Sequence, residues 1–340
     1  MDFLPTLWFV LIAVLWTGYL FLEGFDLGVG MMLKLFARNE SDRRVLLNTI
    51  GPVWDGNEVW LLTAGGATFA AFPFWYASLF SALYIPLVLV LVGLIFRAVA
   101  IEYRGKSHTS TGREAWTWAI VLGSFVAAFG VGAMLALSTT GLPLDANGDR
   151  VGGPFAWFTP YALLGGAGVV LFSLIQGLAF VGLKTDGDVR YKADAWLRRA
   201  MPWALLPLAA WALAVVLRGD AAWTWAPLLV AVAAVLVATV TAWQRAEGIT
   251  FLLIGLFLVM GVVAIFGSAY PVVLPSTLDS AWDLTVSNAS SSPYTLRLMS
   301  IVACFGVPLV LAYQAWSYWV FRKRLTGRHL PAPHAVTPVV

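Results

Sequence analysis

Charged side chains are scarce in this 340-residue sequence, because Asp, Glu, Lys and Arg make up only 11% of it and hydrophobic residues 60%. An average soluble domain carries about 25% charged residues, and the mean hydropathy here is +0.82. The composition excludes a soluble domain and predicts a membrane protein. The 17 Trp and 10 Tyr residues fit the amphipathic aromatics that gather at membrane interfaces.

Cysteine and histidine are almost absent. The one cysteine, Cys304, lies in an apolar run, which excludes a disulfide within the chain and a cysteine-cluster metal site. His108 lies in a basic loop, and His329 and His334 lie near the C-terminus, so no predicted span offers an imidazole to haem or metal. We therefore expect no cofactor and no metal in this chain.

Basic residues are few and lie in short loops between apolar runs. A net charge of +3 is thus a signal of membrane topology, and no patch that would bind nucleic acid is present. No Lys or Arg precedes Lys34, so the positive segment of a cleaved signal peptide is missing and the first helix is expected to be retained.

Apolar runs bounded by charges or turn residues predict eight spans. These runs are 4–33, 75–96, 115–139, 160–183, 200–217, 222–243, 249–268 and 297–321. A ninth span is expected before the second of them, since residues 59–96 contain no charge. As one helix they would extend about 57 Å, nearly twice the hydrocarbon core of about 30 Å. A break at Pro73 divides them, and the first part spans only if its helix begins near Gly51.

The loop charges agree with nine spans. With that count, 18 of the 21 Lys and Arg residues, Arg97 among them, fall in alternate loops, which places the N-terminus outside and the C-terminus in the cytoplasm. The alternative is a re-entrant or interfacial segment over 51–71. The predicted fold is all-α and polytopic, with a single integral membrane domain over 1–324 and a cytoplasmic tail over 325–340.

Two pairs of carboxylates interrupt the first two spans near the same leaflet: Glu23 with Asp26, and Asp55 with Glu58. Members of each pair are three residues apart and share a helix face. Intramembrane carboxylates are costly and usually face an interior or a hydrated path, which favours a proton or ion route. The alternative is helix capping and packing, because acids suit a helix start after Pro52. Capping does not explain acids in the C-terminal part of the first helix.

Two further motifs have simpler interpretations. Gly24 and Gly28 form a small-residue pair that favours close packing against a neighbouring helix. Trp54 and Trp60 flank the second acidic pair and are read as interface anchors or packing groups.

Four segments together resemble subunit II of cytochrome bd quinol oxidase. They are EGFDLGVG (23–30), GPVWDGNEVWLLTAGGATFAAFP (51–73), FRAVAIEYR (96–104) and NASSSPYTLRLM with YQAWSYWVFRKR (288–324). The resemblance implies about nine transmembrane helices, arranged as two four-helix bundles plus one peripheral helix. It implies a heterodimer with a similarly folded subunit I in a bacterial plasma membrane, and it leaves open a small single-span accessory subunit and bound quinone or lipid.

The resemblance also implies a division of labour. Subunit I would carry haem b and haem d, oxidise quinol and reduce oxygen to water, whereas this subunit would support it. A cytoplasmic proton route would pass through Asp55, with Glu58, Glu23 and Asp26 at matching acidic positions. Trp60 would lie near an apolar oxygen path.

Two other functions are compatible with the residues alone. In a secondary transporter, the carboxylates would bind a coupling cation at broken helices. However, no matching pair of Gly- or Pro-interrupted helices occurs in two halves, and the acids lie towards one face. In a purely structural subunit, the acids would only hold helices together.

The nine-span topology predicts the behaviour of reporter fusions. A reporter fused after Arg324 should be active only inside the cell, and one inserted in the 270–295 loop only outside. Activity of both reporters on the same side of the membrane would contradict nine spans.

Overall fold

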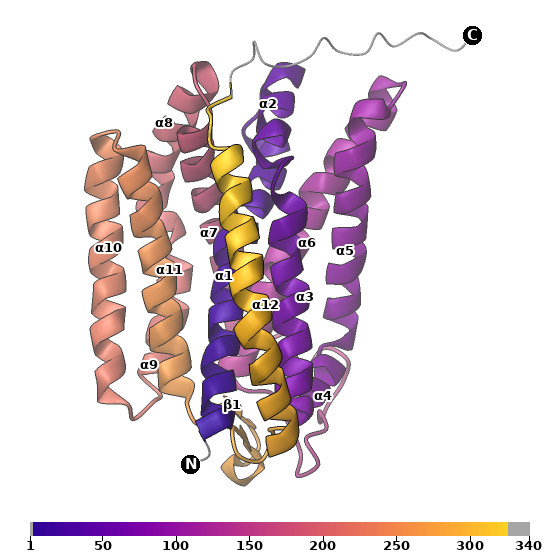
Figure 1. Cartoon of the computed structure of the whole chain (residues 1–340), viewed down its shortest axis with the longest axis vertical. Helices are drawn as coiled ribbons and strands as arrows, with labels where there is room; N and C mark the ends of the chain where they lie inside the picture. The colour runs from indigo at the N-terminus through magenta and orange to yellow at the C-terminus, as the bar shows by residue number, and fades with distance from the viewer. Residues whose placement is uncertain (1–2, 326–340) are drawn as a thin grey trace.

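The computed structural model describes residues 3–325, and its helices run side by side along one long axis (Figure 1). The α-helices are α1 (Phe3–Leu35), α2 (Glu40–Ile50), α3 (Trp54–Ala71), α4 (Pro73–Ala82), α5 (Tyr84–Tyr103), α6 (Ser110–Thr140), α7 (Pro160–Lys184), α8 (Asp188–Ala204), α9 (Leu206–Val216), α10 (Trp225–Trp243), α11 (Glu247–Ala269) and α12 (Pro293–Val320). Short 3-10 helices cover Arg104–Lys106, Ala222–Thr224 and Ser280–Trp282. The strands β1 (Val272–Leu274) and β2 (Leu284–Thr285) form an antiparallel pair.

Within residues 3–325, eight helical segments are long and apolar enough to cross a membrane. The polar start of α3 keeps it outside this set, yet its 18 residues extend about 27 Å and run beside α1 and α12 (Figure 1). The predicted all-α polytopic membrane fold is confirmed, and the predicted count of about nine spans holds approximately.

The long charge-free stretch breaks where Pro73 predicted, because Phe72 ends α3 and Pro73 opens the short helix α4. The predicted bounds of the second and third spans were wrong. The third span is α5, which begins at Tyr84 and continues to Tyr103, so Arg97 lies inside a membrane helix and not in a loop. The second helix begins at Trp54 and not near Gly51, since residues 51–53 form a turn after α2.

The sixth span also differs from its prediction. It was expected to begin at residue 200, but α8 begins at Asp188 and continues almost directly into α9, so the helical segment that could cross a membrane extends over 188–216. The basic residues of α8 that were assigned to a loop are therefore helical.

The bundle centre consists of α1, α6 and α7, which all pack against one another. Glycine permits the closest approach: a Cβ atom added to Gly28 would lie 1.8 Å from the carbonyl oxygen of Ser173 on α7. A Cβ on Gly132 of α6 would likewise lie 2.4 Å from the carbonyl oxygen of Gly165 on α7. The close helix packing predicted at Gly28 is thus present, and α1 and α7 touch through their backbones.

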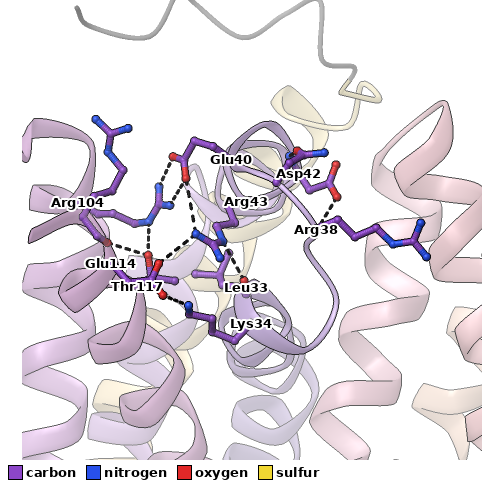
Figure 2. A network of polar contacts seen from close by, with 11 residues as sticks. Leu33, Lys34, Arg38, Glu40, Asp42, Arg43, Arg104, Glu114 and Thr117 are labelled. Atoms are coloured by element: carbon purple, nitrogen blue, oxygen red, sulfur yellow. Dashed lines mark hydrogen bonds and ion pairs between the residues drawn. The ribbon is translucent and has the colours of Figure 1, made fainter. Parts of the chain in front are cut away.

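Ion pairs join helices at one end of the bundle, the upper end in Figure 1. We call it the basic end, and it comprises α2 and the connecting segments 36–39, 51–53, 104–109, 185–187, 244–246 and 321–325. Figure 2 shows Arg104 donating to both carboxylate oxygens of Glu40 at 2.9 and 2.7 Å, and through Nε to Thr117 at 2.9 Å. These contacts join α2 to the α5–α6 turn and to α6.

A second set of contacts beside Arg104 joins α1 to α6. Arg43 lies 3.2 Å from Glu114 and donates to the Leu33 carbonyl at 3.3 Å, and Lys34 pairs with the same Glu114 (Figure 2). Charged side chains at the basic end therefore form ion pairs that link α1, α2 and α6.

The chain returns to the basic end after α12. Arg324 binds Glu247 at 2.5 Å, and Glu247 also binds Arg190 at 2.5 Å. Leu325 donates its N–H to the Lys184 carbonyl at 2.8 Å. Of the predicted tail 325–340, only Leu325 is among the described residues. The contacts of Arg324 and Leu325 hold the segment after α12 against the end of α7 and the start of α11. Most of α12 itself is exposed.

The close crossing of α1 and α7 gives a stability prediction. Gly28→Ala should destabilise the purified protein by about 1–3 kcal/mol, because the added methyl group forces two backbones apart. Gly261→Ala on α11 is the matched control, since its Cβ would meet no atom within 4 Å. Thermal unfolding in detergent measures both variants, and equal melting temperatures would contradict the backbone contact.

Candidate functional site

A fully buried arginine joins three helices. Arg97 on α5 has 0% exposure, and its Nη1 atom lies 2.8 Å from Glu23 Oε1 on α1 and 3.4 Å from Glu58 Oε2 on α3. Glu23 is also fully buried, whereas the Glu58 side chain is 21% exposed. One guanidinium nitrogen therefore reaches an interior carboxylate and a partly accessible one.

Asp26 is held by a neighbouring amide. Asn57 on α3 is fully buried, donates its Nδ2 group to Asp26 Oδ2 at 2.7 Å, and accepts at Oδ1 from Tyr318 at 2.8 Å and from Gln314 at 3.1 Å. Gln314 in turn accepts from Trp60 Nε1 at 2.8 Å. Because two donors converge on Oδ1, the amide orientation of Asn57 is fixed and its NH₂ group points to Asp26.

These contacts bring ionisable groups to ion-pair or hydrogen-bond distance from their partners inside a membrane protein. Removing ions from water costs several kcal/mol each, and only close pairing and further hydrogen bonds offset that cost. Carboxylates that are held in this way can accept and release protons when a donor lies within hydrogen-bond reach. The arrangement suits proton transfer as well as helix packing.

The structure brings three of the four predicted acids together: Glu23, Asp26 and Glu58 meet around Arg97 and Asn57. Asp55 is exposed in the first turn of α3, on a different face from Asn57. Val53, which precedes α3, makes no side-chain cap. Acids in the first turn still complement the helix dipole there.

The two tryptophans of this segment also have defined positions. Trp60 packs so closely on Gly18 of α1 that a Cβ there would lie 2.2 Å from its ring. Trp54 is buried with its ring 5.9 Å from the Arg97 guanidinium. Both therefore pack against helices, and Trp60 additionally orients Gln314.

The sequence did not identify Arg97 as part of the site, nor Gln314 and Tyr318 of α12. Arg97 was read as the end of an apolar run, although the next residues, AVAI, continue the apolar pattern for another turn. Nothing in the local sequence of Gln314 or Tyr318 distinguishes them from interfacial polar residues. They are identified only by their contact with Asn57, more than 250 residues away in the chain.

No group of three or more His, Cys, Asp or Glu side chains in the described part of the chain could hold a metal ion. His108 is exposed in the turn before α6, and His329 and His334 lie outside the described residues.

The fold and this site define a class: a polytopic α-helical membrane protein with an ion-paired acid cluster enclosed by its helices. Residues 4–321 match the family described as cytochrome bd terminal oxidase subunit II. Cytochrome bd ubiquinol oxidase subunit 2 of Bacillus subtilis is 41% identical, with 96% of this chain and 98% of that protein covered. The bd-I subunit 2 of Escherichia coli K12 is 32% identical, with 96% of each covered.

A solved structure has the same fold. The bd oxidase from Geobacillus thermodenitrificans contains a chain that superposes with a TM-score of 0.75 at 18% identity, with 94% of this chain and 99% of that chain covered. The chain belongs to the cytochrome bd terminal oxidase subunit II family and is a multi-pass bacterial membrane protein. The predicted family is confirmed.

The buried ion pair gives a double-mutant prediction. Arg97→Met should destabilise the protein by about 3–5 kcal/mol, because Glu23 would remain buried without its partner. Combining it with Glu23→Gln should recover part of that loss. Arg199→Met, at an exposed position of α8, is the control and should change stability by no more than about 0.5 kcal/mol. Additive losses in thermal unfolding would contradict the pairing.

Proposed function

We propose that this chain is the haem-free subunit II of a cytochrome bd-type quinol oxidase. It would support a subunit I that carries haem b and haem d, oxidises quinol and reduces oxygen to water. Family membership and the ubiquinol oxidase names of the relatives support the assignment. They do not favour a secondary transporter. As a heterodimer, the complex would also leave room for a small single-span accessory subunit and for bound quinone or lipid.

We further propose that the acid cluster delivers protons to the site of oxygen reduction. The observation that carries this proposal is the shared contact of Arg97 with Glu58, which solvent or a partner can reach, and with Glu23, which they cannot. Asp55 would collect protons at the exposed start of α3, and Glu58, Glu23 and Asp26 would pass them inwards. Oxygen reduction consumes protons, so buried carboxylates beside fixed donors would serve the reaction.

The proposed orientation puts the basic end in the cytoplasm, with the N-terminus outside and the C-terminus inside, because cytoplasmic loops are rich in Lys and Arg. Residues 1–324 would form one integral membrane domain, followed by a cytoplasmic tail. Trp60, at the contact of α1 and α3, would border the oxygen path.

Neutral variants of the acids test proton delivery. Asp26→Asn keeps an acceptor for Asn57 and removes the titratable group, so oxygen consumption per haem d should fall on the order of 10²-fold, as for loss of an acid–base group. Asp55→Asn, Glu58→Gln and Glu23→Gln should each slow oxygen consumption and proton uptake, with haem content intact. Asp220→Asn at the opposite end is the control. Wild-type rates in all four acid variants would refute the route.

The haem-free assignment is tested separately. Changing His108, His329 and His334 to Ala together should leave the haem content of the purified complex unaltered, because none is expected to ligate iron. Optical spectra of the complex measure this, and loss of any haem band in the triple variant would overturn the assignment.

A further inference from the structure

Three residues on α6 and α7 bury polar atoms that have no hydrogen-bond partner among residues 3–325. They are both amide atoms of Gln176 and the hydroxyl oxygens of Ser124 and Ser173. All three side chains are fully buried. Each such atom costs about 1–3 kcal/mol if it stays unsatisfied, and buried polar atoms in proteins are generally bonded to protein groups or to ordered water.

The backbones of the two serines lie at one level of the bundle. Gly132 of α6 packs on Gly165 of α7, which fixes the register of these antiparallel helices. Ser124 and Ser173 are each eight residues from that contact towards the basic end, about 12 Å at 1.5 Å per residue. On α1, a Cβ on Gly30 would lie 2.1 Å from the Ser124 hydroxyl oxygen, and a Cβ on Gly24 would lie 3.9 Å from that of Ser173. The two hydroxyl groups are therefore separated by about six residues of α1, roughly 9 Å, a gap that more than one water molecule would bridge.

Gln176 faces the same junction. It follows Val169 by seven residues and Gly165 by eleven, so it lies on the face of α7 that packs against Gly132. The next residue, Gly177, packs on the backbone of Gly28. Gln176 therefore projects into the junction of α1, α6 and α7, about one turn beyond Ser173 towards the basic end.

The junction adjoins the acid cluster. Glu23, Asp26 and Gly30 follow one another at spacings of three and four residues and so form one stripe of α1. Arg97 packs its Cβ beside Gly123, the neighbour of Ser124, and its Nε and Nη2 atoms are also buried without a partner in the described chain. Glu23 Oε1 and Oε2 and Asp26 Oδ1 likewise have no hydrogen-bond partner there, so unpartnered donors and acceptors extend from the cluster towards the serines.

The chemistry of these groups selects the ligand. The Gln176 amide and the serine hydroxyls offer donors as well as acceptors, all of them neutral. The guanidinium of Arg97 disfavours a cation there, and the carboxylates of Glu23 and Asp26 disfavour an anion. Water donates and accepts, carries no charge and typically makes about three hydrogen bonds to such groups.

We propose that Gln176, Ser124 and Ser173 bind a cluster of ordered water at this junction, which continues to the free N–H groups of Arg97. The water site stands independently of proton delivery. Its further role, to give the acids a hydrogen-bonded path towards the bundle centre, rests on the proposed function.

Radiolytic hydroxyl-radical footprinting of the purified complex tests the site, because radicals formed from internal water modify nearby buried side chains. Ile120, whose Cγ2 atom would lie 3.4 Å from a Cβ on Gly30, and Met31 have 0% and 2% exposure and are shielded from bulk solvent. We expect both to be modified in the wild type and to lose the modification in Gln176→Leu. Ser138→Ala is the control, since that hydroxyl is already bonded to the Val273 carbonyl.

Unmodified Ile120 and Met31 in the wild type, or modification that survives Gln176→Leu, would overturn the proposal. If Gln176→Leu does not assemble, Ser124→Ala and a high-resolution map of the wild-type complex decide. Water density at the Gln176 amide supports the proposal, and an amide bonded only to protein groups refutes it. The oxygen consumption of Asp26→Asn judges proton delivery separately, so failure of one proposal is distinguishable from failure of the other.

Discussion

The pairing of Arg97 with Glu23 is the interaction on which the arrangement of the first helices depends. An arginine inside a membrane helix is tolerated only when it faces the protein interior and finds a partner. Here the partner is on α1, a second carboxylate is on α3, and the three helices are therefore held at one depth. Because Glu23 and Glu58 both face the interior, the Arg97 guanidinium of α5 can stay within the bundle.

The other contacts of the site follow from that alignment. With α3 held against α1, Asn57 reaches Asp26 and presents its carbonyl oxygen to α12, which otherwise has little buried surface. The close approach of α1 and α7 at Gly28 encloses the acids from the other side. At the basic end, the Arg104–Glu40 pair joins α2 to the turn between α5 and α6 (Figure 2). The fold thus encloses carboxylates while leaving Glu58 partly accessible.

Much of this could be read from the sequence, and the misses have physical causes. Long apolar runs predicted the spans, since bilayer thickness imposes a minimum length, and Pro73 marked the break because proline lacks an N–H donor. The acids were recognised because charge is costly in a membrane. Arg97 was misplaced because a charge at the edge of a run looks like a loop residue until its buried partner is known. Gln314 and Tyr318 depend on contacts between distant segments, which no local pattern contains.

We propose above all that enclosed carboxylates of this subunit exchange protons during oxygen reduction. Infrared difference spectroscopy of the complex, recorded between its oxidised and reduced states, measures this most directly, because protonated carboxyl groups absorb in their own C=O stretching region. We expect a signal there that is lost or shifted in Asp26→Asn or Glu23→Gln. Identical difference spectra in the wild type and in both variants would show that these groups keep their protonation throughout and serve only the fold.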